Sequence, residues 1–282
     1  MLRRLIIAQA IGLGMLAPAM AADSSNMNGP PPEFGWTDFY AGVIVSGEWS
    51  NDQIATVTKN VSSIADLNGD IGGAVATQGT GSVRSKANRF AGGYQLGYNY
   101  QNESWVLGVV ADIEELEGPN GTSSITNTGA VSGAADPTAS TGTITSSKSL
   151  NYLGTVRGRV GWLVSDKILA FATGGFAYGG ASARTTVSET LGFNDTPPFG
   201  TSGGFARTKV GWTAGAGFEW MFMPQWSLSA EYLYYDLGSE RYKLPRLKQY
   251  GDFGDTLETV SAVQSTTRFS GNTVRLGIGY HF

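Results

Sequence analysis

The chain has 282 residues, of which 15% are charged and 40 are glycine, and its formal net charge is -4. The charged fraction is low and glycine has about twice its average share, which favours a β protein over a helical enzyme. There is no basic excess to indicate a nucleic-acid partner. The lack of cysteine excludes disulfides and thiolate metal sites, and the single histidine, His281, leaves little room for histidine chemistry.

The first 21 residues predict a cleaved secretory signal peptide. Met1–Arg4 is a short basic region, residues 5–16 are mostly apolar, and Ala19-Met20-Ala21 forms a small-residue cleavage site. No later stretch reaches the roughly 18 apolar residues of a membrane helix. The mature chain is therefore expected to be secreted, periplasmic or a membrane barrel. It begins with a Pro/Gly-rich segment, residues 22–35, that is expected to be a flexible or extended lead-in.

From residue 36 onward the dominant signal is alternation of apolar and polar residues at period two, which predicts β-strands. The segments long enough to cross a bilayer as tilted strands, which takes about 9–11 residues, number eight. They are residues 39–47, 90–100, 105–115, 152–162, 168–182, 210–220, 226–236 and 273–282. The fifth is the weakest, because Leu169 and Phe171 break its pattern.

The connections between these strands alternate between short and long. The short ones are residues 101–104, 165–167 and 223–225, and the long ones, rich in small and polar residues, are about 48–87, 116–150, 183–207 and 239–272. Short periplasmic turns with long extracellular loops are typical of outer-membrane barrels. A further pair of strands within 61–85 stays possible.

Two more patterns separate a membrane barrel from a soluble sandwich. Aromatic residues gather near both ends of the predicted strands, where membrane interfaces would lie. The predicted inward face carries charges of both signs and the outward face essentially none, the reverse of a soluble protein. The inward charges are Asp112, Glu114, Arg157, Arg159, Glu219, Glu231 and Arg275. We therefore predict an all-β fold, an eight-stranded antiparallel transmembrane β-barrel over residues 36–282.

Several glycine- and aromatic-rich motifs carry a family resemblance. They are Trp36–Gly42, Gly92–Asn99, Gly154–Gly161, Ala172–Gly179, Gly211–Gly217 and Val274–Phe282. With them the chain resembles the small outer-membrane β-barrel surface proteins of alphaproteobacteria, which are porin-like and similar in architecture to the OmpA membrane domain. The resemblance implies an outer-membrane location, insertion by the outer-membrane assembly machinery, and an assembly signal at Tyr280 and Phe282.

The inward charges have two interpretations. They form a salt-bridged plug, because an eight-stranded barrel is barely wide enough for its own side chains and buried charges must pair, or they line a narrow pore. The first favours a structural, surface-exposed role in the envelope, and the alternative is a small porin for passive diffusion of small solutes. A second basic set is either a solvated loop or a contact with the anionic phosphates of lipopolysaccharide. It consists of Arg241, Lys243, Arg246 and Lys248.

Two motifs with possible chemistry are weak. Gly200–Gly204 matches the G-x-S-x-G nucleophile motif, but His281 is expected at the opposite end of the barrel from Ser202. Asp66–Asp70 begins like a calcium loop but has Ile71 and Thr77 where glycine and a bidentate glutamate belong. We therefore expect no enzyme activity, no catalytic residue, no metal and no cofactor, and the sequence leaves any host or environmental ligand open.

Overall fold

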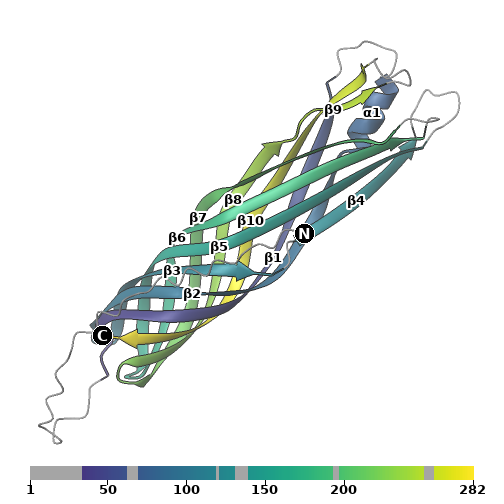
Figure 1. The fold of residues 1–282 in the computed structure, drawn as a ribbon. Helices are drawn as coiled ribbons and strands as arrows, with labels where there is room; N and C mark the ends of the chain where they lie inside the picture. Colours follow the sequence, from purple (N-terminus) through teal and green to yellow (C-terminus); the bar gives the residue numbers. More distant parts are fainter. Residues whose placement is uncertain (1–33, 62–68, 119–120, 131–138, 193–196, 251–256) are drawn as a thin grey trace, which may run out of the picture. The chain divides into compact units, whose positions relative to one another are not determined.

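The computed structural model describes residues 34–61, 69–118, 121–130, 139–192, 197–250 and 257–282, so the predicted signal peptide and most of the lead-in lie outside it. Its elements are strands apart from one helix (Figure 1). They are β1 (Asp38–Asn60), α1 (Gly69–Gln78), β2 (Gly81–Asn102), β3 (Trp105–Glu117), β4 (Gly121–Ala130), β5 (Ala139–Ser165), β6 (Ile168–Leu191), β7 (Phe199–Met223), β8 (Trp226–Lys243), β9 (Leu247–Tyr250) and β10 (Leu257–His281).

Eight of the strands form a closed antiparallel ring. The order is β1-β2-β3-β5-β6-β7-β8-β10, and β10 returns to pair with β1 from Tyr40↔His281 to Asn60↔Ser261. This confirms the predicted eight-stranded barrel. The described residues of the segment 61–85 contribute α1 and the start of β2, and they form no extra strand pair. No helix in the described residues is long and apolar enough to cross a bilayer.

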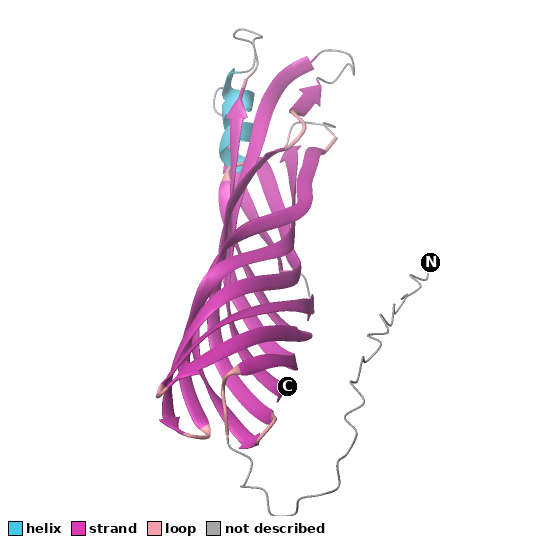
Figure 2. Ribbon diagram, turned by 90° about the vertical axis from the view of Figure 1, so that its left-hand side faces the viewer, coloured by secondary structure: helices cyan, strands magenta, loops and turns pink. Residues whose placement is uncertain are grey.

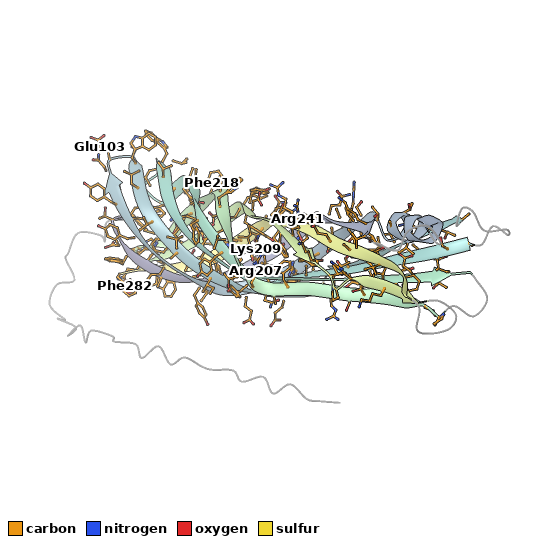
Figure 3. The ribbon with its side chains drawn as sticks, turned by 90° about the horizontal axis from the view of Figure 1, so that it is seen from above. Glu103, Arg207, Lys209, Phe218, Arg241 and Phe282 are labelled. Carbon is orange, nitrogen blue, oxygen red and sulfur yellow. The ribbon has the colours of Figure 1, made fainter. Side chains whose placement is uncertain are left out.

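One end of the barrel is closed by two-residue turns, at Glu103-Ser104, Asp166-Lys167 and Pro224-Gln225. Glu103 has a φ of 52°, the left-handed conformation found in the commonest tight hairpin turns. Figure 3 shows Glu103 and Phe282 at this same end. Towards it the strands expose large apolar side chains on their outer face, such as Leu107 at 55% exposure and Phe218 at 62%. A lipid-facing band explains this pattern, because the same side chains in water would lose the hydrophobic contribution to stability.

The prediction that the long connections are loops is wrong for most of their length. Their ranges, 48–87, 116–150, 183–207 and 239–272, contain extensions of the strands, β4, β9 and α1 (Figure 2). The alternation there is hidden in the sequence because Ser, Thr and Gly occur on both faces. In β5, for example, Ser140 and Ser146 are fully buried, while the neighbouring Thr143 and Thr145 are half-buried.

Beyond the lipid-facing band the ring divides into two facing sheets. Pairing of β7 with β8 stops at Trp212↔Asp236, and pairing of β2 with β3 stops at Phe90↔Glu117. Side chains bridge these two seams: Lys209 donates to the backbone oxygen of Ser239 at 2.9 Å, and Ser85 donates to that of Gly121 at 3.0 Å.

Between the two sheets lies an apolar core that the sequence analysis did not predict. It includes Leu150, Val187, Leu237 and Phe269, each no more than 1% exposed. Helix α1 adds Val75 to this core, and the hydroxyl of Thr58 in β1 donates to the carbonyl of Gly79 just after the helix at 2.6 Å. This part of the chain is therefore a packed sandwich with its own core.

Candidate functional site

The seven charges predicted to face inward lie together inside the barrel. They come from β3, β5, β7, β8 and β10, and six of them are no more than 6% exposed. Asp112 is the centre of the group: one carboxylate oxygen accepts from Arg157 at 2.8 Å and lies 3.2 Å from Arg275. Arg157 also pairs with Glu231, and Arg275 pairs with Glu114 at 2.5 Å. Arg157 and Arg275 are thus each shared between acids, which offsets the desolvation of the buried ions.

The remaining pair, Arg159 and Glu219, is completed by residues that the sequence analysis did not include among the lumen charges. The Arg159 guanidinium lies over the ring of Phe171 at 3.9 Å. His281 reaches Glu219 with its Nε2 at 3.4 Å and stacks on the ring of Tyr40 with centroids 5.4 Å apart. His281 is six residues beyond the predicted inward Arg275 in β10, so alternation puts it on the same face, and Tyr40 is its partner in β1.

Beneath this network, towards the tight turns, the lumen is filled by apolar side chains. Trp36, Val106, Leu169 and Met221 are fully buried there, and the indole of Trp36 donates to the backbone oxygen of Asp166 at 3.1 Å. Leu169, which with Phe171 breaks the expected polar inward pattern of its strand, therefore helps to form a hydrophobic floor. A narrow barrel end excludes water, so apolar side chains are stable there.

Almost no free space is left among the charges. The cavity bordered by Tyr40, Arg157, Arg159, Glu219 and Glu231 measures about 20 Å³, little more than the roughly 10–15 Å³ that one water molecule occupies. The described lumen is thus blocked at this level by side chains from opposite walls.

The comparison with protein families agrees with this architecture. The outer membrane protein beta-barrel domain family matches residues 11–282. The chain belongs to this family. The chain is located in the outer membrane, and its predicted location is confirmed.

Individual relatives are more distant. The chain is 29% identical to the 31 kDa outer-membrane immunogenic protein of Brucella melitensis over 285 residues, 98% of this chain and 99% of the relative. Among solved structures, OprG of Pseudomonas aeruginosa is 11% identical with a TM-score of 0.37, over 90% of this chain and 99% of OprG. Ail of Yersinia pestis is 13% identical with a TM-score of 0.30, over 87% of this chain and 100% of Ail.

A second buried ion network of this outer-membrane barrel lies above the first. Arg89 donates to Glu48 at 3.1 Å and to the carbonyl of Leu150 at 2.7 Å, and Tyr235 donates to Glu48 at 2.6 Å. Lys148 pairs with Asp52 inside the sandwich, where burial lowers the pKa of the ammonium and Asp52 opposes the shift. The predicted strand ends at residue 47. The alternation of Glu48, Ser50 and Asp52 just beyond it is the sequence signal that indicates this second network.

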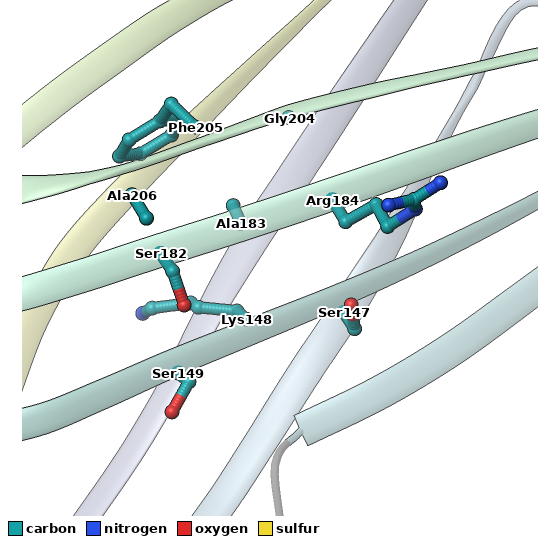
Figure 4. A pocket seen from close by; sticks show the side chains of 9 residues that line it. All are labelled: Ser147, Lys148, Ser149, Ser182, Ala183, Arg184, Gly204, Phe205 and Ala206. Atoms are coloured by element: carbon teal, nitrogen blue, oxygen red, sulfur yellow. The ribbon is translucent and has the colours of Figure 1, made fainter.

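The wall outside Lys148 is built of small side chains. A depression of about 390 Å³ lies there on β5, β6 and β7, and Figure 4 shows the side chains that line it. Ser147, Ser149 and Ser182 line it together with Arg184, which donates to the Ser202 hydroxyl at 3.0 Å. The serines line the depression with hydroxyl groups. Arg184 is the one exposed cation among the lining residues.

Glu189 in β6 is a buried carboxyl that the sequence analysis missed. It lies outside the membrane-spanning segment, is fully buried, and neither of its carboxyl oxygens has a hydrogen-bond partner among the described residues. A Cβ atom built on Gly79, just after α1, would lie 2.9 Å from Glu189, which places the carboxyl directly against the end of the helix. Burial raises the pKa of Glu189 from 4.5 to about 8.

This shift predicts a pH-dependent stability. The folded chain holds a proton on Glu189 that the unfolded chain releases, so the free energy of unfolding should fall as pH rises from about 4.5 to about 8 and level off above that. Glu189→Gln should remove this component and stabilise the protein at pH 8 relative to wild type. Urea unfolding between pH 5 and 9 measures it. Parallel pH profiles of the two proteins would show that Glu189 does not titrate in this range.

The other predicted sites are placed as follows. Ser202 and the rest of Gly200–Gly204 lie in β7, not in a loop, and no helix follows them there; His281 lies at the opposite end of the barrel, since its amide donates to the carbonyl of Gln225. Most of the calcium-like segment lies outside the described residues. Tyr280 and Phe282 lie at the turn end, where Tyr280 contacts Trp226 with ring centroids 5.2 Å apart; their role in assembly stays a prediction.

The predicted basic set also lies in strands and not in a loop. Arg241 and Lys243 belong to β8, Lys248 belongs to β9, and Arg246 lies between them. All four side chains are exposed. In Figure 3, Arg241 lies beyond Phe218 towards the sandwich end, as do Lys209 and Arg207. The last two differ from the basic set because both pair with Glu240.

Proposed function

We propose that the protein is a structural, surface-exposed component of the outer membrane, whose barrel anchors the two-sheet sandwich outside the cell. The observation that carries this proposal is the blocked lumen: seven paired charges leave a cavity of about 20 Å³ at the level of Arg157. An open channel for solutes requires a continuous aqueous path, which wide barrels of about 16 strands provide.

The sandwich supports the surface role in a second way. Strands of 23 to 27 residues such as β1, β5 and β6 are more than twice as long as the about 9–11 residues that cross the bilayer. The part beyond the bilayer is held by its own core and so presents a defined surface. The Brucella relative is named as an immunogenic outer-membrane protein, and we propose the same kind of exposure to a host or the environment for this chain.

The experiment uses the fact that the chain has no cysteine. Thr143→Cys places a thiol on the outer face of β5 in the sandwich, and Glu103→Cys places one in a tight turn. A membrane-impermeant maleimide should label the Thr143 variant on intact cells and the Glu103 variant only after the outer membrane is permeabilised. Labelling of Glu103→Cys but not Thr143→Cys on intact cells would reverse the orientation and contradict the proposal.

We also propose that the basic set Arg241, Lys243, Arg246 and Lys248 contacts lipopolysaccharide. The support is their exposure on the outer face and the preference of Arg and Lys for phosphate oxygens.

A further inference from the structure

Three residues of the basic set, Arg241, Lys243 and Arg246, line a groove on the outer face of the sandwich. The groove has a volume of about 630 Å³ and is formed by β1, β8, β10 and the turn after β8. Four cations line it, because Lys59 of β1 joins the predicted residues Arg241, Lys243 and Arg246. Lys59 is 184 residues from Lys243 in the sequence, so only the closure of β1 against β10 brings it to the others.

The register explains the hollow between these cations. Gln264 of β10 pairs with Val57 on one side and with Lys243 on the other. Ala262, next on the same face, pairs with Lys59. Because Ala262 is short, the floor is low between the long basic side chains.

The charge of the groove selects its ligand. No carboxylate is among its described lining residues, and none of its four cations has an ion pair with a described acid, in contrast to Arg207 and Lys209 nearby. Like charges that lie close together without acids repel one another, so a ligand with several anionic groups stabilises them. Val57 and Pro245 give the groove an apolar wall against which a sugar ring can pack.

The height of the groove decides which anions it can reach. Lys243 is nine residues beyond Tyr234, whose ring lies 5.3 Å from that of Trp212 in the outer aromatic girdle. At about 3.3 Å per residue and a tilt of about 40°, the groove lies about 20 Å above the membrane interface. Phosphates at the lipid headgroups lie near that interface and are out of reach. The groove also opens sideways, on the same face as the lipid-facing residues, towards the sugar layer around the barrel.

We propose that this groove binds the anionic, phosphate- or carboxylate-bearing sugar portion of lipopolysaccharide, and not its lipid-anchored phosphates. This deepens the proposed lipopolysaccharide contact, and it rests on the proposed function only in placing the sandwich outside the cell. Bound sugars would hold the sandwich within the saccharide layer. The binding itself is measured on purified protein, so it can fail while surface labelling succeeds, and the reverse.

The test uses the full chain refolded into lipid nanodiscs and three probes. They are the lipid-free oligosaccharide of de-acylated lipopolysaccharide, the same oligosaccharide after dephosphorylation and reduction of its carboxyl groups to alcohols, and lipid A in vesicles. We expect saturable binding of the first probe, weakened by salt because the contacts are charged. The triple variant Lys59→Gln/Arg241→Gln/Lys243→Gln should weaken this binding by about 10- to 100-fold, as expected for the loss of three charge-assisted contacts.

The matched control removes the same charge elsewhere. Arg84, Lys86 and Arg184 are exposed cations on β2 and β6 that do not line the groove, and their triple change to Gln should leave the affinity within about twofold of wild type, since exposed charges more than a Debye length apart are largely screened. An equal loss of affinity in the control would mean that binding depends on the net charge of the protein and not on the groove, and it would overturn the proposal. Binding of lipid A alone, or unchanged binding of the neutral oligosaccharide, would overturn it as well.

Discussion

Glu231→Ala should destabilise the barrel more than any single substitution of an exposed residue in the sandwich. Glu231 accepts from Arg157 and, at 2.8 Å, from the Thr173 hydroxyl. Removing the carboxylate leaves Arg157 with Asp112 alone in a nearly dry interior, and breaking a buried ion pair typically costs about 3–5 kcal/mol. We expect a loss towards the lower end of this range, because Asp112 stays within 2.8 Å of Arg157.

A double-mutant cycle identifies the pair. Arg157→Met in the Glu231→Ala background should recover part of the lost stability. Asp112 would then pair with Arg275 at 3.2 Å, and no arginine that has lost an ion-pair partner would remain in the lumen. The measurement is urea unfolding in lipid vesicles, with the shift in gel migration on boiling as the marker of the folded barrel. Glu117→Ala, at an exposed carboxylate, is the control and should change stability by less than about 0.5 kcal/mol. Purely additive losses in the cycle would mean that the two residues do not interact.

Gly97→Val should have an effect of similar size by a different route. Gly97 in β2 lies opposite Tyr40 in β1, and a Cβ atom at Gly97 would lie 2.4 Å from the Tyr40 ring. The ring cannot move aside easily, because it is 2% exposed and stacked on His281. Overpacking of a filled interior costs about 1–3 kcal/mol, and the displaced ring would also disturb Arg159, whose guanidinium lies 3.5 Å from the Tyr40 hydroxyl.

The control for this substitution is on the same strand. Gly92 faces outward, and the nearest atom to a Cβ there is 3.9 Å away. Gly92→Val adds an apolar side chain on the lipid-facing side and should leave the unfolding free energy within about 0.5 kcal/mol of wild type. Equal losses for the two variants would indicate a general intolerance of β2 to β-branched residues, and the specific contact between Gly97 and Tyr40 would be refuted.

The parts that could be predicted from the sequence are those where the residues on one face of a strand are apolar and those on the other face are polar or glycine. In β10, apolar Val274, Leu276 and Ile278 alternate with Arg275 and glycine, and the structure exposes the first set and buries Arg275. The same contrast placed all seven lumen charges on the inward face. Their pairing could not be derived, because it depends on which strands face each other across the barrel.

In the rest of the chain the two faces of a strand differ less in polarity, for two physical reasons. In the sandwich both faces of a strand such as β5 carry hydroxyl residues, since one face is solvated and the other mixes hydroxyl with apolar groups. At the turn end the lumen is too narrow for water, so Leu169 and Phe171 point inward and disguise the alternation of β6. The cation groove needed a further fact, the closure of β1 on β10, which brings Lys59 to Arg241.

The blocked lumen is tested most directly by conductance. Wild-type protein refolded into a planar bilayer should show no large steady channel, because the network around Arg157 and the floor around Leu169 close the described interior in two successive layers. The Glu231→Ala variant, with a carboxylate removed from the upper of these layers, should conduct at most in brief, small events. A large, steady pore in the wild-type protein would contradict the account and would make passive diffusion of small solutes the function of the barrel.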